Sequence, residues 1–188
     1  MKALSQILNQ KKYTSDNDEM IKSLFKKEHF KRKSLIFSNG DHNTKHYVIG
    51  SGLLRMYVIN SSGKEFNVLF AKENQLIGDL GSPSPTKFNL DAIEDTIVFT
   101  IDSRNLEKFI NLSNNNLEIG AFTQLTRSYI FLQNRLISIL TQTAEENFIS
   151  FQKQYPDLLQ RLPQYHIASY LGVSAEFLSK IIARTLKK

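Results

Sequence analysis

The sequence has 188 residues, of which 41% are hydrophobic and 22% charged, and it carries a formal net charge of +6 with no cysteine. This length and composition are those of a globular protein of one or two domains. The lack of cysteine excludes disulfides, thiolate nucleophiles and cysteine-bound zinc or iron–sulfur clusters. No apolar run reaches the length of about 18 residues that spans a membrane, and the N-terminal apolar segment is too short for a secretory signal. We therefore expect a cytoplasmic protein without a membrane partner, whose positive charge favours a polyanionic one.

The N-terminal region, from Met1 to about Phe30, is predicted to form short amphipathic helices. Its apolar residues recur at helical spacing between polar ones, namely Leu4, Ile7, Leu8, Met20, Ile21, Leu24 and Phe25. A basic run overlaps its end and consists of Lys26, Lys27, Lys31, Arg32 and Lys33. Runs of like charge usually form a solvated face, so this run does not by itself indicate a nucleic-acid site.

Short strands are predicted from about Lys33 to Asp102. The segment HYVIGSGLLRMYVINSSGKEFNVLF holds three apolar runs separated by turns of glycine and serine, and AIEDTIVFTID is rich in β-branched residues. Several short strands at this spacing indicate a compact β-barrel or β-roll. The intervening QLIGDLGSPSPTKFNL is predicted to be a loop, because it contains two glycines and two prolines.

Helical periodicity returns after Asp102, and the longest helix is predicted to follow Asn116. Six apolar residues recur there at spacings of three and four, the heptad pattern of a pairing helix: Phe122, Leu125, Tyr129, Leu132, Leu136 and Ile139. A second stripe lies beside them and consists of Ile130, Ile137 and Leu140. A single helix packed on one core would also carry an apolar stripe, but a seam this regular favours a homodimer.

A further helix is predicted over AEENFISFQKQY, starting at Thr141 or Thr143 and ending before Pro156. The segment LLQRLP that follows is a candidate strand or wing. A domain boundary is expected near Leu140 to Thr143.

The stretch QYHIASYLGVSAEFLSKIIAR, from Gln164 to Arg184, has the pattern of a helix-turn-helix. Gly172 can adopt the left-handed conformation that ends a helix, and Ser174 can cap the next one. Apolar residues at helical spacing would form the facing sides of the two helices, namely Ile167, Ala168, Leu171, Leu178, Ile181 and Ile182. Two short helices joined by a glycine-containing turn are typical of a DNA-binding motif, although an ordinary helical hairpin shares this spacing.

The order of β-roll, pairing helix and helix-turn-helix resembles the Crp/Fnr family of bacterial transcription regulators. The resemblance covers essentially the whole chain and rests on YVIGSGLLRMYVINSSGKEF, on LIGDLGS followed by FNLDAIEDTIVFTID, and on HIASYLGVSAEFLSKI. It implies an α+β fold in three parts. These are a cyclic-nucleotide-binding-like sensor β-roll with flanking helices over residues 1–112, a long dimerisation helix over 113–141, and a winged helix-turn-helix DNA-binding domain over 142–188.

The resemblance also implies an effector pocket in the β-roll, at Gly78, Asp79, Thr86 and Lys87. In family members that bind cyclic AMP, a Gly-Glu pair is followed by an Arg-Ser that holds the cyclic phosphate. Here the acid at Asp79 is one methylene shorter, and Thr86-Lys87 stands at the Arg-Ser positions. Lysine lacks the forked guanidinium that binds a phosphate through two hydrogen bonds. We therefore do not expect cyclic AMP to bind, and the effector is unknown.

In the second helix of the motif the resemblance implies roles position by position. Ser174 matches the residue that opens the helix and touches phosphate, Glu176 an acid that accepts a hydrogen bond from cytosine, and Lys180 an arginine that reads guanine. Ala175 stands where some members carry a base-reading arginine. The residues expected to contact DNA are thus Ser174, Glu176, Ser179, Lys180 and Arg184, the last of them through phosphate.

We therefore predict a dimeric, sequence-specific DNA-binding transcription regulator, which is not an enzyme and has no cofactor or metal. Its predicted partners are double-stranded DNA and a second copy of the chain, with RNA polymerase as a further candidate.

Two other functions remain open on the sequence alone. A cupin-like metal-binding barrel would use His42, His46 and Glu65, although HNTKH lacks the cupin spacing of two histidines one residue apart. A haem ligand would have to be His29, His42, His46 or His166, all of which are expected at the surface. A protein-interaction module would need only the pairing helix.

Overall fold

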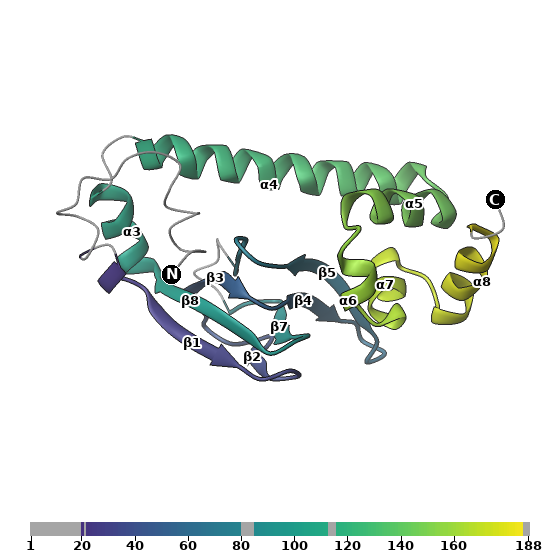
Figure 1. Ribbon diagram of the computed structural model, residues 1–188, viewed down its shortest axis with the longest axis horizontal. Coiled ribbons are helices and arrows are strands. Elements are labelled where there is room, and N and C mark those ends of the chain that lie inside the picture. The colour runs from purple at the N-terminus through teal and green to yellow at the C-terminus, as the bar shows by residue number, and fades with distance from the viewer. Residues whose placement is uncertain (1–19, 21, 80–84, 113–115, 186–188) are drawn as a thin grey trace. The chain divides into compact units, whose positions relative to one another are not determined.

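The computed structural model describes residue 20 and residues 22–79, 85–112 and 116–185 (Figure 1). The chain divides into two compact units. The first comprises Met1–Val58 with Val68–Glu118, and the second comprises Ile59–Asn67 with Ile119–Lys188. Each unit is described in turn.

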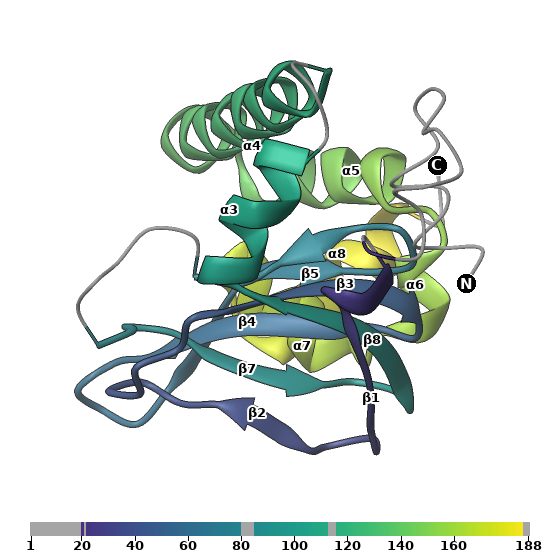
Figure 2. The same ribbon diagram turned by 90° about the vertical axis from the view of Figure 1, so that its left-hand side faces the viewer.

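Two antiparallel sheets make up the first unit, which confirms the predicted β-roll. The strands are β1 (Lys26–Phe30), β2 (Leu35–Phe37), β3 (Lys45–Ser51), β4 (Leu54–Ile59), β5 (Glu65–Ala71), β6 (Leu76–Ile77), β7 (Asn89–Ala92) and β8 (Thr96–Asp102). One sheet has the order β1-β8-β3-β6 and the other β2-β7-β4-β5. In Figure 2, β2 and β7 form the lower edge of the roll.

The core of the roll is built from residues of both sheets. Ile49 and Val98 come from one sheet and Leu54 and Leu90 from the other, and all four side chains are fully buried. Gly52 lies in the turn between β3 and β4 with a φ of 100°, and a Cβ there would lie 2.7 Å from the Asp95 carbonyl oxygen. This turn therefore requires glycine.

Two predictions about the roll are wrong. Residues 26–30, read as the end of a helical region, form β1, which pairs with β8 from Lys26 opposite Thr100 to Phe30 opposite Thr96. The Thr100 hydroxyl reaches the Glu28 carboxylate at 2.9 Å, a contact between residues 72 apart that local periodicity does not reveal. The stretch read as a loop also contains the short strand β6, which pairs with β3.

Helix α3 (Ser103–Leu112) follows the roll, and the carboxylate of Asp102 caps it. One oxygen of Asp102 accepts a hydrogen bond from the Asn105 amide at 2.8 Å. The ring of Phe109 on this helix packs edge-on against Phe25, with centroids 5.4 Å apart.

The second unit is helical, apart from Ile59–Asn67, which is the end of the hairpin that joins β4 to β5. We call this segment the hairpin end. The helices of the unit are α4 (Asn116–Thr141), α5 (Ala144–Gln154), α6 (Leu158–Arg161), α7 (Gln164–Leu171) and α8 (Ala175–Thr185). Of the two candidate starts for α5, Thr143 is the cap: its hydroxyl and backbone exchange hydrogen bonds with Glu146 in a capping box.

The segment LLQRLP is predicted from the sequence to be a strand or wing. Its first four residues instead form helix α6, and Leu162 caps the end of that helix. Leu158 and Leu162 are both buried, and their spacing of four residues brings them to one side of a helical turn. The structured residues from 144 to 185 contain no strand, so no wing accompanies the helix-turn-helix there.

Candidate nucleic-acid interface

The predicted helix-turn-helix is present as α7, a three-residue turn and α8. Gly172 caps α7 with a φ of 73°, in the left-handed region, and the Val173 amide donates to the Ala168 carbonyl at 3.0 Å. On the inward side of α8, Leu178 and Ile181 are 0% and 2% exposed. These contacts fix the angle between the helices, so the opposite side of α8 is held in a defined direction.

The residues predicted to contact DNA are all exposed. They are Ser174, which directly precedes α8, and Glu176, Ser179, Lys180 and Arg184 on the helix itself. Ser174 precedes the helix and caps it, because its hydroxyl oxygen accepts a hydrogen bond from the Phe177 amide at 3.1 Å. A cap of this kind stabilises the first turn of a helix, which in helix-turn-helix proteins is the part that meets base edges.

Glu176 is held ionised in this first turn. Its pKa lies below the usual value because the carboxylate accepts hydrogen bonds from its own backbone amide and from the Ser174 hydroxyl, with a further attraction to Lys180. The Ser179 hydroxyl lies 3.4 Å from the side-chain oxygen of Gln164, at the start of α7. Ser179 thus links the two helices as well as facing outward.

A polar cluster, which the sequence did not indicate and in which Asn67 and His166 are buried, holds α7 against the hairpin end of the same unit. We call Glu65, Asn67, Arg135, His166 and Ser169 the Asn67 cluster. The Asn67 amide nitrogen donates to the His166 carbonyl at 2.8 Å and lies 3.3 Å from Nδ1 of its ring. The Ser169 hydroxyl donates to the Glu65 carbonyl at 2.7 Å and accepts from the Asn67 backbone amide at 3.1 Å.

Helix α4 joins this cluster through Arg135. One guanidinium nitrogen donates to the backbone carbonyls of Asn67 and Tyr170, at 3.0 and 3.1 Å. The guanidinium also stacks on the Tyr170 ring, 3.6 Å from its centroid. Because Tyr170 lies in the last turn of α7, the arginine satisfies a carbonyl that the helix itself leaves without a partner.

We expect Asn67→Ala to lower the free energy of unfolding by about 1–3 kcal/mol, because the His166 carbonyl would be left buried without its donor. Asn67 is only 2% exposed, so water cannot readily replace the lost amide. Urea denaturation would measure the change. Asn134→Ala removes an amide from an exposed position on α4 and should leave the urea midpoint nearly unchanged.

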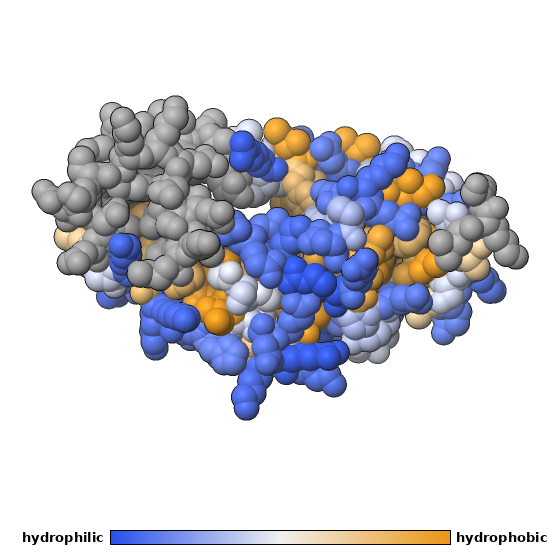
Figure 3. Space-filling model, viewed as in Figure 1, coloured by the Kyte–Doolittle hydropathy of each residue, from blue (hydrophilic) through white to orange (hydrophobic). Residues whose placement is uncertain are grey.

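The predicted pairing seam of α4 is exposed. Tyr129, Leu132, Leu136 and Ile139 are between 53% and 61% exposed, and the second stripe of Ile130, Ile137 and Leu140 is between 48% and 73% exposed. The side chains of Phe122 and Leu125 lie outside the described part. Figure 3 shows apolar side chains along its upper edge, where α4 runs. Exposed apolar side chains that gather in one patch are typical of an interaction site.

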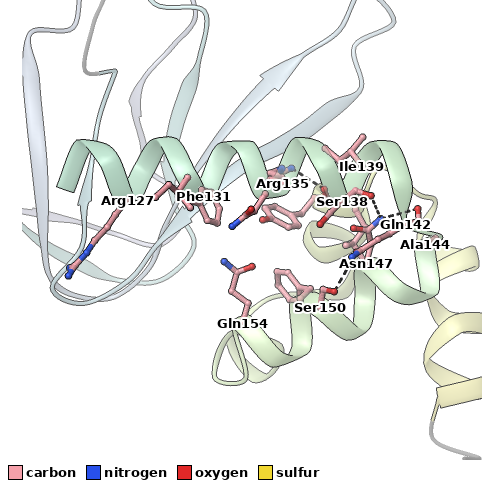
Figure 4. A pocket seen from close by; sticks show the side chains of 15 residues that line it. Arg127, Phe131, Arg135, Ser138, Ile139, Gln142, Ala144, Asn147, Ser150 and Gln154 are labelled. Atoms are coloured by element: carbon pink, nitrogen blue, oxygen red, sulfur yellow. Dashed lines mark hydrogen bonds between the residues drawn. The ribbon is translucent and has the colours of Figure 1, made fainter. Parts of the chain in front are cut away.

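A cavity of about 440 Å³ lies between α4, α5 and α7 (Figure 4). Arg127, Phe131 and Arg135 of α4 line it on one side, and Ser150 and Gln154 of α5 face them. Two arginines and several amides line this cavity, and no acidic residue does. The sequence analysis did not predict it, because its walls come from three helices.

The four predicted effector residues differ in their surroundings. Gly78 follows β6, and Asp79 is partly buried. The backbone of Thr86 pairs with that of Gly40 and Asp41, and its hydroxyl oxygen accepts from the Phe88 amide at 3.2 Å. Thr86 is buried, whereas Lys87 is exposed. The hydroxyl of Thr86 is therefore engaged locally.

Two of the histidines expected at the surface are buried. His46 is 5% exposed and His166 is 6% exposed, the latter within the Asn67 cluster. Nε2 of His46 lies 3.4 Å from the Ser103 hydroxyl, and Nδ1 has no hydrogen-bond partner among the described residues. Burial lowers the pKa of His46, against a smaller opposing effect of Asp102. His29 and His42 are exposed, as predicted.

The described residues contain no group of three or more His, Cys, Asp or Glu side chains that could hold a metal ion, as a cupin-like site would need. None of the helices in the described ranges has the length and apolarity needed to cross a membrane.

The chain matches the model of one domain family and is similar in sequence to a known regulatory protein. Residues 27–113 match the family model of the cyclic nucleotide-binding domain. The nitrogen fixation regulation protein FixK of Rhizobium meliloti is 28% identical to the chain over 156 residues, which cover 79% of this chain and 70% of that protein.

Solved structures share the fold over most of the chain. FixK2 from Bradyrhizobium japonicum has a TM-score of 0.78 at 17% identity, covering 87% of this chain and 85% of that one. A CooA mutant from Carboxydothermus hydrogenoformans has a TM-score of 0.77 at 16% identity, covering 97% and 83%. The chain thus matches a cyclic nucleotide-binding domain over residues 27–113, and it shares the fold of FixK2 and CooA over most of its length.

Proposed function

We propose that the protein is a dimeric, sequence-specific DNA-binding regulator of transcription. The observation that carries this proposal is the pattern of exposure on α8: Glu176 and Lys180 are exposed, whereas Leu178 and Ile181 are buried. An acid and a base one turn apart can accept from cytosine and donate to guanine in the major groove. Arg184, at the end of the helix, would contact phosphate and set the register.

The exposed seam of α4 supports the dimer in this proposal. Leu132 and Leu136 are 53% and 57% exposed. Exposure of these apolar side chains to water is unfavourable, and pairing with the same helix of a second copy would bury them. Two copies would present two recognition helices to half-sites about one turn of DNA apart, so the operator is expected to be a pseudo-palindrome. The net charge of +6 favours DNA as the partner.

We further propose that the β-roll senses a small effector other than cyclic AMP. The position of the family's phosphate-binding arginine is held by Thr86, whose hydroxyl already accepts from the Phe88 amide. Lys87 beside it is exposed and could offer an anion only a single point of charge. Isothermal titration with cyclic AMP should give no heat of binding at millimolar ligand, and a saturable isotherm would contradict this part of the proposal.

Lys180→Ala should weaken binding to the preferred DNA sequence about tenfold and relax the preference for guanine at one position of each half-site. The probe is the consensus duplex that the purified protein selects from a random pool, and fluorescence anisotropy at fixed salt measures the affinity. Lys153→Ala removes the same charge from an exposed position on α5 and should change the affinity less than twofold.

Three results would contradict this proposal. Failure of the selection to converge on any sequence would argue for a protein-interaction module. Equal losses for the two lysine variants would make Lys180 a general charge contact. Unchanged binding by Lys180→Ala would remove the residue from the interface.

A further inference from the structure

An aromatic ring lies exposed in the first turn of α8. Phe177 is 46% exposed, whereas Leu178 and Ile181, which fix α8 against α7, are 0% and 2% exposed. In the described part of the chain no ring–ring or cation–ring contact involves Phe177. The ring therefore lies outside the buried core of the helix-turn-helix.

The position of Phe177 is set by the cap of the helix. It is the third residue of α8, and its backbone amide donates to the Ser174 hydroxyl oxygen at 3.1 Å. Glu176 precedes it, and Lys180 lies about 60° from it around the helix, one turn further on. Phe177 thus belongs to the turn whose side chains reach base edges in helix-turn-helix proteins.

The base edges in the major groove offer hydrogen-bond donors and acceptors, and their one apolar group is the C5 methyl of thymine. An exposed phenyl ring cannot bond to the polar groups, but it can bury a methyl. We propose that Phe177 is a specificity-determining residue that contacts the methyl of a thymine in each half-site. This inference rests on the proposed DNA-binding function.

A uracil scan of the selected consensus duplex tests the proposal. Replacing thymine by uracil removes the methyl and leaves every hydrogen-bonding group of the base pair in place. At one thymine of each half-site, uracil should weaken binding by the wild-type protein about three- to fivefold, the effect of one buried methyl group. Because the scan uses the wild-type chain, its result does not depend on how any variant folds.

The assignment to Phe177 comes from a double-mutant cycle. Phe177→Ala should bind the thymine and uracil duplexes with equal affinity, because the ring that buried the methyl is gone. Tyr165→Ala removes another exposed aromatic ring, on α7, and should keep the three- to fivefold preference for thymine. Circular dichroism melting verifies that both variants are folded under the binding conditions.

The outcomes separate this inference from the function on which it rests. If no consensus is selected, the proposed function fails. If a consensus is selected but uracil is tolerated at every position, Phe177 does not read a methyl and the inference is overturned. Persistence of the thymine preference in Phe177→Ala would overturn it too, because another residue would then contact the methyl.

Discussion

Leu136→Glu is expected to give a protein that sediments at 21.6 kDa, the mass of one chain, whereas the unaltered protein is expected to sediment at twice that mass. Leu136 belongs to the exposed seam of α4 and is itself 57% exposed. In a pair of α4 helices the two glutamates would face each other in an apolar interface, where ionised groups are costly to bury. Sedimentation equilibrium over a range of concentrations measures the change.

The same variant should lose about a hundredfold or more in affinity for the consensus duplex. A monomer binds one half-site at a time, so it lacks the gain that comes from linking two recognition helices. The affinity for a single half-site should stay the same, because Leu136 lies on α4 and not on α8. Anisotropy titrations with full-length and half-site duplexes separate these two affinities.

Asn134→Glu is the matched control. It places the same charge on an exposed position of the same helix, outside the seam. Its sedimentation mass and its affinity for the consensus duplex should equal those of the unaltered protein. A Leu136→Glu protein that still sediments as a dimer would show that the seam of α4 does not hold the two copies together.

Local signals explain why the helix-turn-helix could be predicted. Gly172 adopts the left-handed conformation that its place after Leu171 suggested, and Ser174 accepts the capping hydrogen bond expected of it. Leu178 and Ile181 are buried at the spacing that their periodicity predicted. Each of these features depends on residues within four positions of one another, which is the range that a sequence pattern can show.

Features that depend on distant residues were missed. Strand β1 is a strand because β8 offers it an edge about 70 residues away, and its own sequence is a basic run without clear alternation. The Asn67 cluster joins residues about 100 positions apart through a single asparagine. Nothing in the periodicity around Asn67 distinguishes it from an exposed turn residue, because its partners are backbone groups and a histidine of α7.

The buried histidines show the same limit. His46 and His166 were expected at the surface because histidine is most often found there, and no neighbouring residue in the sequence indicated otherwise. His166 is buried by its contacts with the hairpin end, and His46 by its place in β3 between β6 and β8. Sheet order and tertiary packing decide such cases, and a single sequence reveals neither.

Asp91→Ala is expected to lower the free energy of unfolding by about 3–5 kcal/mol, which would be a large share of the total stability of a domain. Arg55 and Asp91 lie opposite each other on β4 and β7. The guanidinium meets the carboxylate through two bonds of 2.8 Å, and the side chains are only 7% and 15% exposed. Without Asp91, the guanidinium would stay buried but would lose these hydrogen bonds and the charge of this carboxylate. Denaturant unfolding measures the loss.

The double variant Arg55→Met with Asp91→Leu tests whether the loss in Asp91→Ala comes from the buried charge of Arg55. Replacing both members removes the buried charge together with its partner, so the double variant should be more stable than Asp91→Ala. The Arg55 guanidinium lies over the Tyr57 ring, 4.0 Å from its centroid, and the methionine thioether can pack against the same ring. If the double variant were less stable than Asp91→Ala, Arg55 would stabilise the roll through contacts other than those with Asp91. The expected recovery would mean that Asp91 chiefly allows Arg55 to be buried in the roll.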